Sequence, residues 1–216
     1  RRPPRSTQGV SSAASDVYKR QVSENPEVVF TGSGQTVLAC PTLVGGKDWE
    51  AGAYSPLTGL MYFPLRNACA RMMATTESDS VASSLYALAV RSEIAPGTDQ
   101  VGTVQAISAE TGEIVWRYEQ RSATTSLVAT AGGLVFGGDV NGRFRAFDQV
   151  TGEVLWEINL GSPVSGFPIS FAVDGRQYVV ASTGNAANSG INLRMTPELR
   201  PSRGNNIFVF ALPDRQ

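Results

Sequence analysis

Apolar and polar residues alternate over short runs along most of this chain, and glycine-containing turns separate the runs. Val104, Ala106 and Ser108 occupy every second position, which places them on one face of a predicted β-strand. A Thr-Gly pair then predicts a tight turn, because glycine adopts a positive φ without a Cβ clash. The same spacing resumes at Ile114 and Trp116, so the two runs predict a pair of adjacent strands.

Further strands are predicted towards the end of the chain. The predicted elements are Gly132–Asp139 as a strand and turn, Asp174-Gly175 as a hairpin turn, Gln177–Ser182 as a strand and Ile207–Pro213 as a last strand. No segment has a convincing pattern for a long helix, and no apolar run is long enough to span a bilayer. We therefore predict an all-β fold.

One unit occurs twice with a shift of 40 residues. Gly102–Trp116 and Gly142–Trp156 share Gly, Ala, Thr-Gly-Glu and Trp in phase, and Ala53–Tyr62 is a degenerate third copy. Such a period is typical of β-propeller blades, and at about 40–50 residues per blade the segment 22–216 would form roughly four of them.

A single blade has two apolar faces and cannot bury both alone. We expect Trp116 and Trp156, the tryptophans that end the two copies, to pack against the neighbouring blade, since a large flat ring suits contact between sheets. They are predicted to have a structural docking role.

Residues 1–21 stand apart from this pattern. They have no periodicity and no hydrophobic cluster, and Asp16–Gln21 resembles the translation of a transposon-end sequencing adapter. We interpret 1–21 as a disordered, non-native leader and expect natural sequence upstream of Val22 to have been lost. A natural disordered tail is the alternative.

Composition narrows the possible functions. The leader holds five of the 18 basic residues and one of the 19 acidic ones, so residues 22–216 have a net charge of −5. An acidic body argues against nucleic acid as a partner. The chain has no histidine, which excludes a Ser-His-Asp triad and histidine-ligated zinc within it.

Several motifs, taken together and in order, resemble those of pyrroloquinoline-quinone (PQQ) dehydrogenases, the quinoprotein alcohol dehydrogenase family. The tryptophan-docking pattern Ala-x-Asp-x-x-Thr-Gly-Glu-x-x-Trp is complete at Ala146–Trp156, and at Ala106–Trp116 its Asp is replaced by Ser108. The other matching segments are Gly45–Trp49, Ala53–Leu60, Thr130–Phe136, Gly161–Pro168 and Gly204–Pro213. The resemblance implies about four C-terminal blades of an eight-bladed quinoprotein propeller.

The resemblance also implies a function. In this family the quinone lies at the propeller axis, a calcium or lanthanide ion polarises its carbonyl, an Asp takes the alcohol proton, and hydride passes to the quinone. The metal ligands and the catalytic Asp come from blades outside this chain. We expect oxidation of a small primary alcohol in the periplasm, with electrons passed to a cytochrome c or a similar acceptor. One alternative is a scaffold propeller without cofactor; another is an enzyme for sugars or polyols.

Two residues are candidates for contact with the cofactor. Asp48 occupies the place of an Asn that hydrogen-bonds the quinone in the family's Gly-Gly-x-Asn-Trp motif, but an ionised carboxylate cannot donate that bond. The alternative for Asp48 is a turn residue that caps backbone N–H groups. Trp49 could line the site, although packing between strands is favoured for it. Lys47 is expected to be solvated.

The remaining candidates also come from the resemblance. Cys40 and Cys69, the only cysteines, match a structural disulfide of related methanol dehydrogenases, which fits an oxidising compartment; two free thiols are the alternative. Aromatic residues of the family are replaced by Thr124 and its neighbours and by Asn185, which indicates a divergent pocket or one without quinone. Residues 65–100 are interpreted as a long insertion, either a cap over the substrate entrance or a surface loop pinned by Cys69.

Overall fold

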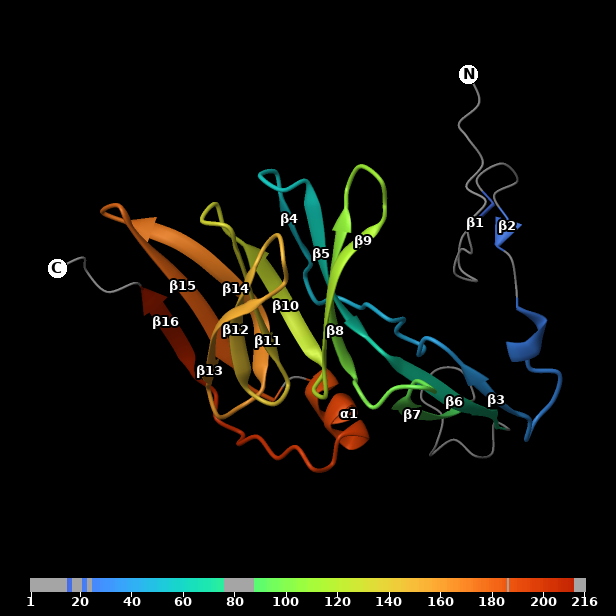
Figure 1. The fold of residues 1–216 in the computed structure, drawn as a ribbon. Coiled ribbons are helices and arrows are strands. Elements are labelled where there is room, and N and C mark those ends of the chain that lie inside the picture. The colour runs from blue at the N-terminus through green and yellow to red at the C-terminus, as the bar shows by residue number, and fades with distance from the viewer. Residues whose placement is uncertain (1–14, 17–20, 23–24, 76–87, 186, 212–216) are drawn as a thin grey trace, which may run out of the picture. The chain divides into compact units, whose positions relative to one another are not determined.

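The computed structural model describes residues 15–16, 21–22, 25–75, 88–185 and 187–211 (Figure 1). Most of residues 1–21, interpreted above as a leader, lie outside this described part. Only a two-residue pairing is described there, between β1 (Ser15–Asp16) and β2 (Gln21–Val22). In the described residues, no helix combines the length and the apolar character needed to cross a membrane.

The chain divides into two compact units, which we describe separately. The first, here the small unit, comprises Arg1–Ala39 and Arg71–Arg91; the second, here the blade unit, comprises Cys40–Ala70 and Ser92–Gln216. In the small unit, η1 (Pro26–Val28) is a short 3-10 helix whose first turn is capped by Asn25, because the Asn25 side chain accepts a hydrogen bond from the Glu27 amide.

The blade unit contains three antiparallel sheets, in which sequential strands are hydrogen-bonded neighbours except that β5 pairs with β8. Blade 1 has the order β4 (Ala53–Ser55), β5 (Leu60–Arg66), β8 (Gly102–Ser108) and β9 (Ile114–Gln120). Blade 2 consists of β10 (Thr124–Ala129), β11 (Leu134–Asp139), β12 (Arg143–Asp148) and β13 (Val154–Asn159). Blade 3 has three strands, β14 (Val164–Val173), β15 (Arg176–Thr183) and β16 (Ile207–Ala211).

The first strands of the three blades approach one another. Strand β10 contacts both β4 and β14, and Figure 1 shows β10 and β14 side by side. In a propeller, sheets are arranged radially around a central channel, so the strands that meet in this way form the inner edge. The prediction of an all-β, partial propeller is confirmed.

Each pair of neighbouring blades encloses its own hydrophobic core. Between blades 1 and 2 the core contains Leu60, Tyr62, Val104, Ala106, Trp116, Leu127, Val135 and Phe147. Between blades 2 and 3 it contains Phe144, Leu160, Val164, Val179 and Ala181. Alternation in the sequence produces these cores, because every second side chain of a strand points to the same face.

The segment 65–100 is not the long loop expected from the sequence. It contains the end of β5, then β6 (Ala68–Ala74) and β7 (Leu88–Ile94), which form a three-stranded sheet with β3 (Thr36–Ala39) in the order β3-β6-β7. Part of the segment, residues 76–87, lies outside the described residues. The interpretation as a loop was wrong because the Ser/Thr-rich stretch in the middle led us to assign the whole segment, including the strands on either side, to a loop.

A short helix, α1 (Ala187–Met195), follows β15 and was not anticipated. Its residues Leu193 and Met195 pack with Ala68, Val101 and Val140 in a small third core. The sequence predicted roughly four blades. The described residues form two four-stranded sheets, one three-stranded sheet and the separate β3-β6-β7 sheet.

Candidate functional site

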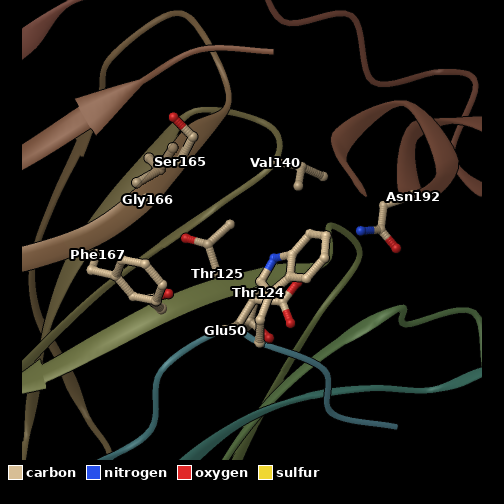
Figure 2. Close-up of a pocket in the computed structure, with 11 residues that line it drawn as sticks. Glu50, Thr124, Thr125, Val140, Ser165, Gly166, Phe167 and Asn192 are labelled. Atoms are coloured by element: carbon tan, nitrogen blue, oxygen red, sulfur yellow. The ribbon is translucent and has the colours of Figure 1, made fainter. Parts of the chain in front are cut away.

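A pocket of about 100 Å³ opens in the blade unit where β10 and β14 begin (Figure 2). Six of its eleven lining residues have polar side chains. The lining consists of Trp49, Glu50, Thr124, Thr125, Ser126, Val140, Val164, Ser165, Gly166, Phe167 and Asn192. Because β10 and β14 are inner strands, this pocket lies at the inner edge of the blades.

Trp49 and Glu50, in the segment Asp48–Glu50, form one wall of the pocket, and the segment is held by a buried cation. The Nη2 of Arg66 lies 3.8 Å from Asp48 Oδ2 and 3.6 Å from Glu50 Oε2. Arg66 is on the face of β5 that points inward together with Leu60 and Tyr62, so its charge is largely removed from water. A buried charge needs partners of opposite sign, and the two carboxylates supply them.

The same wall is also bonded to β10. Ala51 donates its backbone N–H to Ser126 Oγ at 3.0 Å, and its carbonyl accepts from the Leu127 amide at 2.9 Å. Thr124 turns its hydroxyl to the Leu65 carbonyl, 3.1 Å away. The two bonds of Ala51 attach the end of the wall to β10, and the Thr124 bond joins β10 to β5, so this side of the pocket is preformed.

Two polar groups of the lining are buried without a hydrogen-bond partner in the described structure. They are the hydroxyl of Thr125 and the amide oxygen of Asn192. The Asn192 residue is 3% exposed and Thr125 is 9% exposed, so solvent does not replace the missing partners. Buried polar groups are almost always bonded, and exceptions commonly mark the place of a water, an ion or a ligand.

The structure separates the two residues predicted to contact a cofactor. Trp49 lines the pocket and is 63% exposed, so packing between strands, the favoured expectation, was wrong for this residue. Asp48 is next to Trp49 in sequence but is not a lining residue, and its carboxylate faces Arg66. Lys47 is exposed and donates from Nζ to the Asp48 carbonyl at 3.1 Å.

The two positions that depart from the family's aromatic pattern also differ. Thr124 lines the pocket with its hydroxyl bonded to the protein, whereas Asn185 is exposed and is not part of the lining. Of these two positions, Thr124 therefore bears directly on the pocket. At Asn185 no contact with this pocket is found in the described residues.

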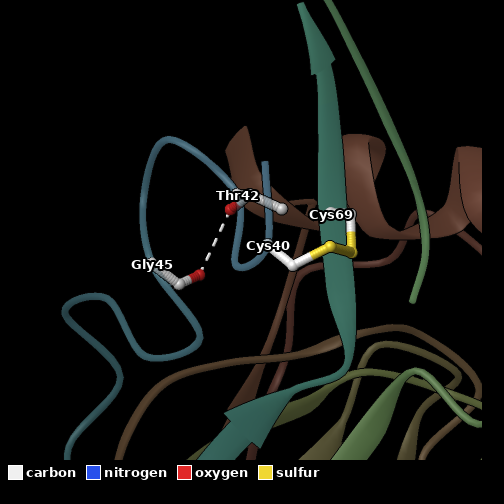
Figure 3. The surroundings of a disulfide bond; sticks show 4 residues. All are labelled: Cys40, Thr42, Gly45 and Cys69. Atoms are coloured by element: carbon white, nitrogen blue, oxygen red, sulfur yellow. Dashed lines mark hydrogen bonds between the residues drawn. A yellow bond between two sulfur atoms is a disulfide. The ribbon is translucent and has the colours of Figure 1, made fainter. Parts of the chain in front are cut away.

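Cys40 and Cys69 form a disulfide within the blade unit (Figure 3). Cys69 is completely buried in β6, and the turn after Cys40 is closed by a hydrogen bond from Thr42 Oγ1 to the Gly45 carbonyl at 3.2 Å. The expected disulfide is present. It covalently anchors the start of the stretch that leads to Asp48–Glu50.

The two repeat tryptophans contact the next blade along the chain. The Trp116 indole N–H donates to the Gln149 carbonyl at 3.0 Å, and its ring is stacked on Phe147 with centroids 6.4 Å apart. Trp156 makes an edge contact with Phe210 of blade 3 at 5.3 Å. Both contacts join consecutive blades.

In the part of the chain that the structure describes, no group of three or more His, Cys, Asp or Glu residues is arranged to hold a metal ion. The lining of the pocket comes mainly from Trp49 and Glu50 and from residues of β10, β14 and α1.

Comparison with known proteins agrees with these features. Residues 120–179 match the family described as "Glucose/ethanol/alcohol dehydrogenase, beta-propeller domain". A quinoprotein ethanol dehydrogenase from Pseudomonas putida is 33% identical over 186 residues, covering 83% of this chain and 29% of the relative. A lanthanide-dependent methanol dehydrogenase from Methylacidiphilum fumariolicum is 38% identical over 157 residues, which cover 70% of this chain and 26% of that protein.

Among solved structures, a europium-containing methanol dehydrogenase superposes with a TM-score of 0.78 and 28% identity, covering 92% of this chain and 38% of that one. The chain belongs to the quinoprotein alcohol dehydrogenase family. The chain spans less than a third of the length of these two curated relatives.

Among the residues that shape the pocket, the sequence analysis missed Glu50, Arg66 and Asn192. The sequence could have indicated Arg66, because in β5 every second residue from Leu60 is buried and Arg66 continues that series. Asn192 reaches the pocket from α1, far from Trp49 in sequence, and no local pattern indicates that meeting.

Proposed function

We propose that the full-length protein to which this quinoprotein chain belongs oxidises alcohols with PQQ as its cofactor. The observation that carries the proposal is the position of the Gly-Gly-x-x-Trp segment. This segment, shared with the family, places Trp49 in a pocket at the inner edge of the blades. The similarity to quinoprotein ethanol dehydrogenases over 83% of the chain supports the same activity.

The residues present fit this cofactor in part. An indole that is 63% exposed beside a pocket offers a flat apolar surface to a planar ring system. Asp48 fits less well, because an ionised carboxylate only accepts hydrogen bonds and this one faces Arg66. Among the residues of this chain, Trp49 would therefore make the contact with the quinone.

When bound, PQQ would supply the hydride acceptor for alcohol oxidation, and calcium or a lanthanide would supply a Lewis acid. The residues of this chain hold the wall of the pocket in position. Arg66 lies between the carboxylates of Asp48 and Glu50 and holds the wall, while Ser126 bonds Ala51, the next residue, to β10. The metal ligands and the catalytic base would come from residues outside this chain.

We further propose a periplasmic location, with a cytochrome c or a similar carrier as electron acceptor. The disulfide between Cys40 and Cys69 supports an oxidising compartment, because disulfides persist there and are rare where thiols are kept reduced.

The test is reconstitution of the full-length protein with PQQ and either Ca²⁺ or La³⁺, followed by alcohol-dependent reduction of an artificial electron acceptor. We expect ethanol-dependent turnover in wild type. The Trp49→Ala variant should bind quinone about tenfold more weakly, and Trp49→Phe should retain most of the affinity because it keeps an aromatic surface.

Absence of quinone binding in the correctly folded full-length protein would overturn the proposal and favour the scaffold alternative. Equal quinone affinity in wild type and Trp49→Ala would remove Trp49 from the cofactor site. Circular dichroism of each variant shows whether the fold is retained.

A further inference from the structure

Three consecutive residues of β10 bring hydroxyl groups to the pocket, and they differ in how the protein uses them. Thr124 donates to the Leu65 carbonyl, and Ser126 accepts from the Ala51 amide. Thr125, which lies between them, is 9% exposed, and its hydroxyl has no hydrogen-bond partner in the described structure. Removing a hydroxyl from water is costly unless it bonds to another group, so Thr125 requires a partner from outside this chain.

Asn192 brings a second group of this kind to the pocket, from α1. It is 3% exposed, and its Oδ1 atom has no partner among the described residues. Figure 2 shows its side chain directed toward the lining residues of β10, with the amide nitrogen foremost. Among the described residues that line the pocket, Asn192 has the only carboxamide. A carboxamide both donates and accepts hydrogen bonds, which suits it to bind a polar ligand.

Contacts on the C-terminal side of Asn192 hold it in place. Met195 packs in the small third core, and Thr196 is completely buried. Thr196 Oγ1 donates to the Asn192 carbonyl at 3.4 Å. Two residues further on, Glu198 Oε1 lies 2.6 Å from Nε of Arg121, just after β9. The Asn192 side chain is therefore positioned before a ligand binds, which reduces the entropic cost of binding.

The proposed cofactor has the chemistry that these two groups require. PQQ is a flat ring system with quinone and carboxylate oxygens along its edge, and such oxygens accept hydrogen bonds. Thr125 and Asn192 can both donate to them, whereas the Asp48 carboxylate is not part of the lining and only accepts when ionised. Trp49 offers its indole to the face of the ring. Contacts with the edge and with the face involve different atoms of the cofactor, so both can form together.

The size of the pocket indicates which part of the cofactor it takes up. A volume of about 100 Å³ corresponds to roughly three water molecules. This space accommodates one edge of a tricyclic quinone and not the whole molecule. The pocket is therefore suited to hold the oxygens of one edge.

We propose that Thr125 and Asn192 bind one edge of the quinone by donating hydrogen bonds to its oxygen atoms, while Trp49 packs against the face of the ring. The inference rests on the proposed function, and it adds two cofactor-binding residues to it. It also gives α1, a short helix between two strands of blade 3, a role in holding the cofactor.

The test is equilibrium binding of PQQ to the quinone-free full-length protein in the presence of Ca²⁺ and without alcohol, followed by quenching of tryptophan fluorescence. Thr125→Val and Asn192→Leu should each weaken quinone binding about fivefold to tenfold, the usual effect of one lost hydrogen bond. Thr125→Ser keeps the hydroxyl and should keep the affinity within about twofold of wild type.

Asn192→Asp tests the donor role of the amide. It keeps the shape of the side chain, but an ionised carboxylate does not donate and repels the carboxylates of the quinone, so binding should weaken at least as much as in Asn192→Leu. Asn185→Asp is the matched control, because Asn185 is exposed and outside the lining, and it should leave the affinity unchanged. Wild-type affinity in Asn192→Asp would overturn the contact with Asn192.

The remaining outcomes separate this inference from the proposed function. Quinone binding by wild type with unchanged affinity in Thr125→Val and Asn192→Leu would mean that water satisfies both groups. It would overturn the inference and leave the proposed function intact. A lower unfolding temperature of the quinone-free variants with unchanged quinone affinity would assign the two residues to the fold alone and would also overturn it. Absence of quinone binding in wild type would overturn the proposed function together with the inference.

Discussion

Blades 1 and 2 end with the same sequence motif, yet their tryptophans meet the next blade in different ways. Trp116 is 8% exposed, with its N–H bonded to the Gln149 carbonyl. Trp156 is 38% exposed, and no hydrogen bond of its indole is found in the described residues. The strands that carry them, β9 and β13, have the same place in their sheets.

The difference comes from the receiving blade. Blade 2 presents to Trp116 the turn at 148–152, which contains both the Gln149 carbonyl and Gly152. Blade 3 presents Phe210 of β16 to Trp156, and the residues after Ala211 lie outside the described part. A docking motif therefore specifies one half of the contact, and the neighbouring turn decides how completely the indole is buried.

Truncation of the two tryptophans is the strongest way to break this comparison. In the full-length protein, Trp116→Ala should lower the free energy of unfolding by about 3–5 kcal/mol, because a buried ring and a satisfied N–H are lost together. Trp156→Ala should cost about 1–2 kcal/mol less, since its ring is already partly solvated. Urea unfolding of both variants gives the two values. Equal losses would mean that the two contacts are equivalent in the full-length protein.

Two glycines in equivalent turns sharpen the comparison. Both Gly112 and Gly152 have a φ of +75°, but a Cβ at Gly152 would lie 2.6 Å from ring atoms of Trp116, while at Gly112 it would meet nothing within 4 Å. Gly112→Ala should cost about 1 kcal/mol from backbone strain alone. Gly152→Ala should cost a further 1–3 kcal/mol from overpacking. Thermal unfolding measures both, and similar losses would contradict the close approach to Trp116.

Tyr62→Phe tests the second hydrogen bond to the same carbonyl. The Tyr62 hydroxyl donates to the Gln149 carbonyl at 3.1 Å from a completely buried side chain. Its removal should lower the unfolding free energy by about 1 kcal/mol. Tyr54→Phe, at an exposed position of β4, is the control and should have no measurable effect. A neutral Tyr62→Phe would show that Trp116 alone satisfies the carbonyl.

The smallest expected effect is on the pH dependence of stability, and it concerns Asp148 and Ser108, the first residues of the two equivalent turns. Asp148 Oδ1 accepts from the amides of Val150 and Thr151 at 2.8 Å, and these bonds hold the pKa of Asp148 below its usual range. A lowered pKa in the folded state adds stability above the unfolded pKa, and that stability is lost as pH falls through the folded pKa. Ser108 accepts from the Thr111 amide in the equivalent turn and carries no charge.

Asp148→Ser should therefore reduce the loss of unfolding temperature between pH 6 and pH 3 relative to wild type. Ser108→Asp should increase that loss, because it adds a capped carboxylate to the first turn. Melting curves at several pH values distinguish the variants, and identical pH profiles would show that Asp148 has the same pKa in the folded and unfolded states.

Local pattern and repetition were sufficient to predict the blades, because a strand-turn-strand unit is encoded by neighbouring residues. The pairing of Cys40 with Cys69 was available only through resemblance to a family. The pocket could be predicted only in part. The Gly-Gly-x-x-Trp motif indicated Trp49, and the alternation in β5 could have indicated a buried charge at Arg66.

The remainder of the site depends on contacts between residues that are distant in sequence, which no local sequence pattern can predict. Asn192 lies on a nine-residue helix with a glycine and two asparagines, which gives no amphipathic signal. Ser126 bonds to Ala51 across 75 residues. Such contacts follow from how the sheets are placed around the inner edge and not from the local preference of either partner.

The covalent tie between Cys40 and Cys69 has a practical consequence for the pocket. The chain passes from Cys40 through the Thr42–Gly45 turn to Trp49, so the disulfide fixes the chain before the wall. Arg66 and β10 hold the other end of the wall, at Glu50 and Ala51. Material made in a reducing host would keep only the far attachments. Ligand measurements on such a preparation would report a looser wall, and export before folding is the appropriate way to produce the protein.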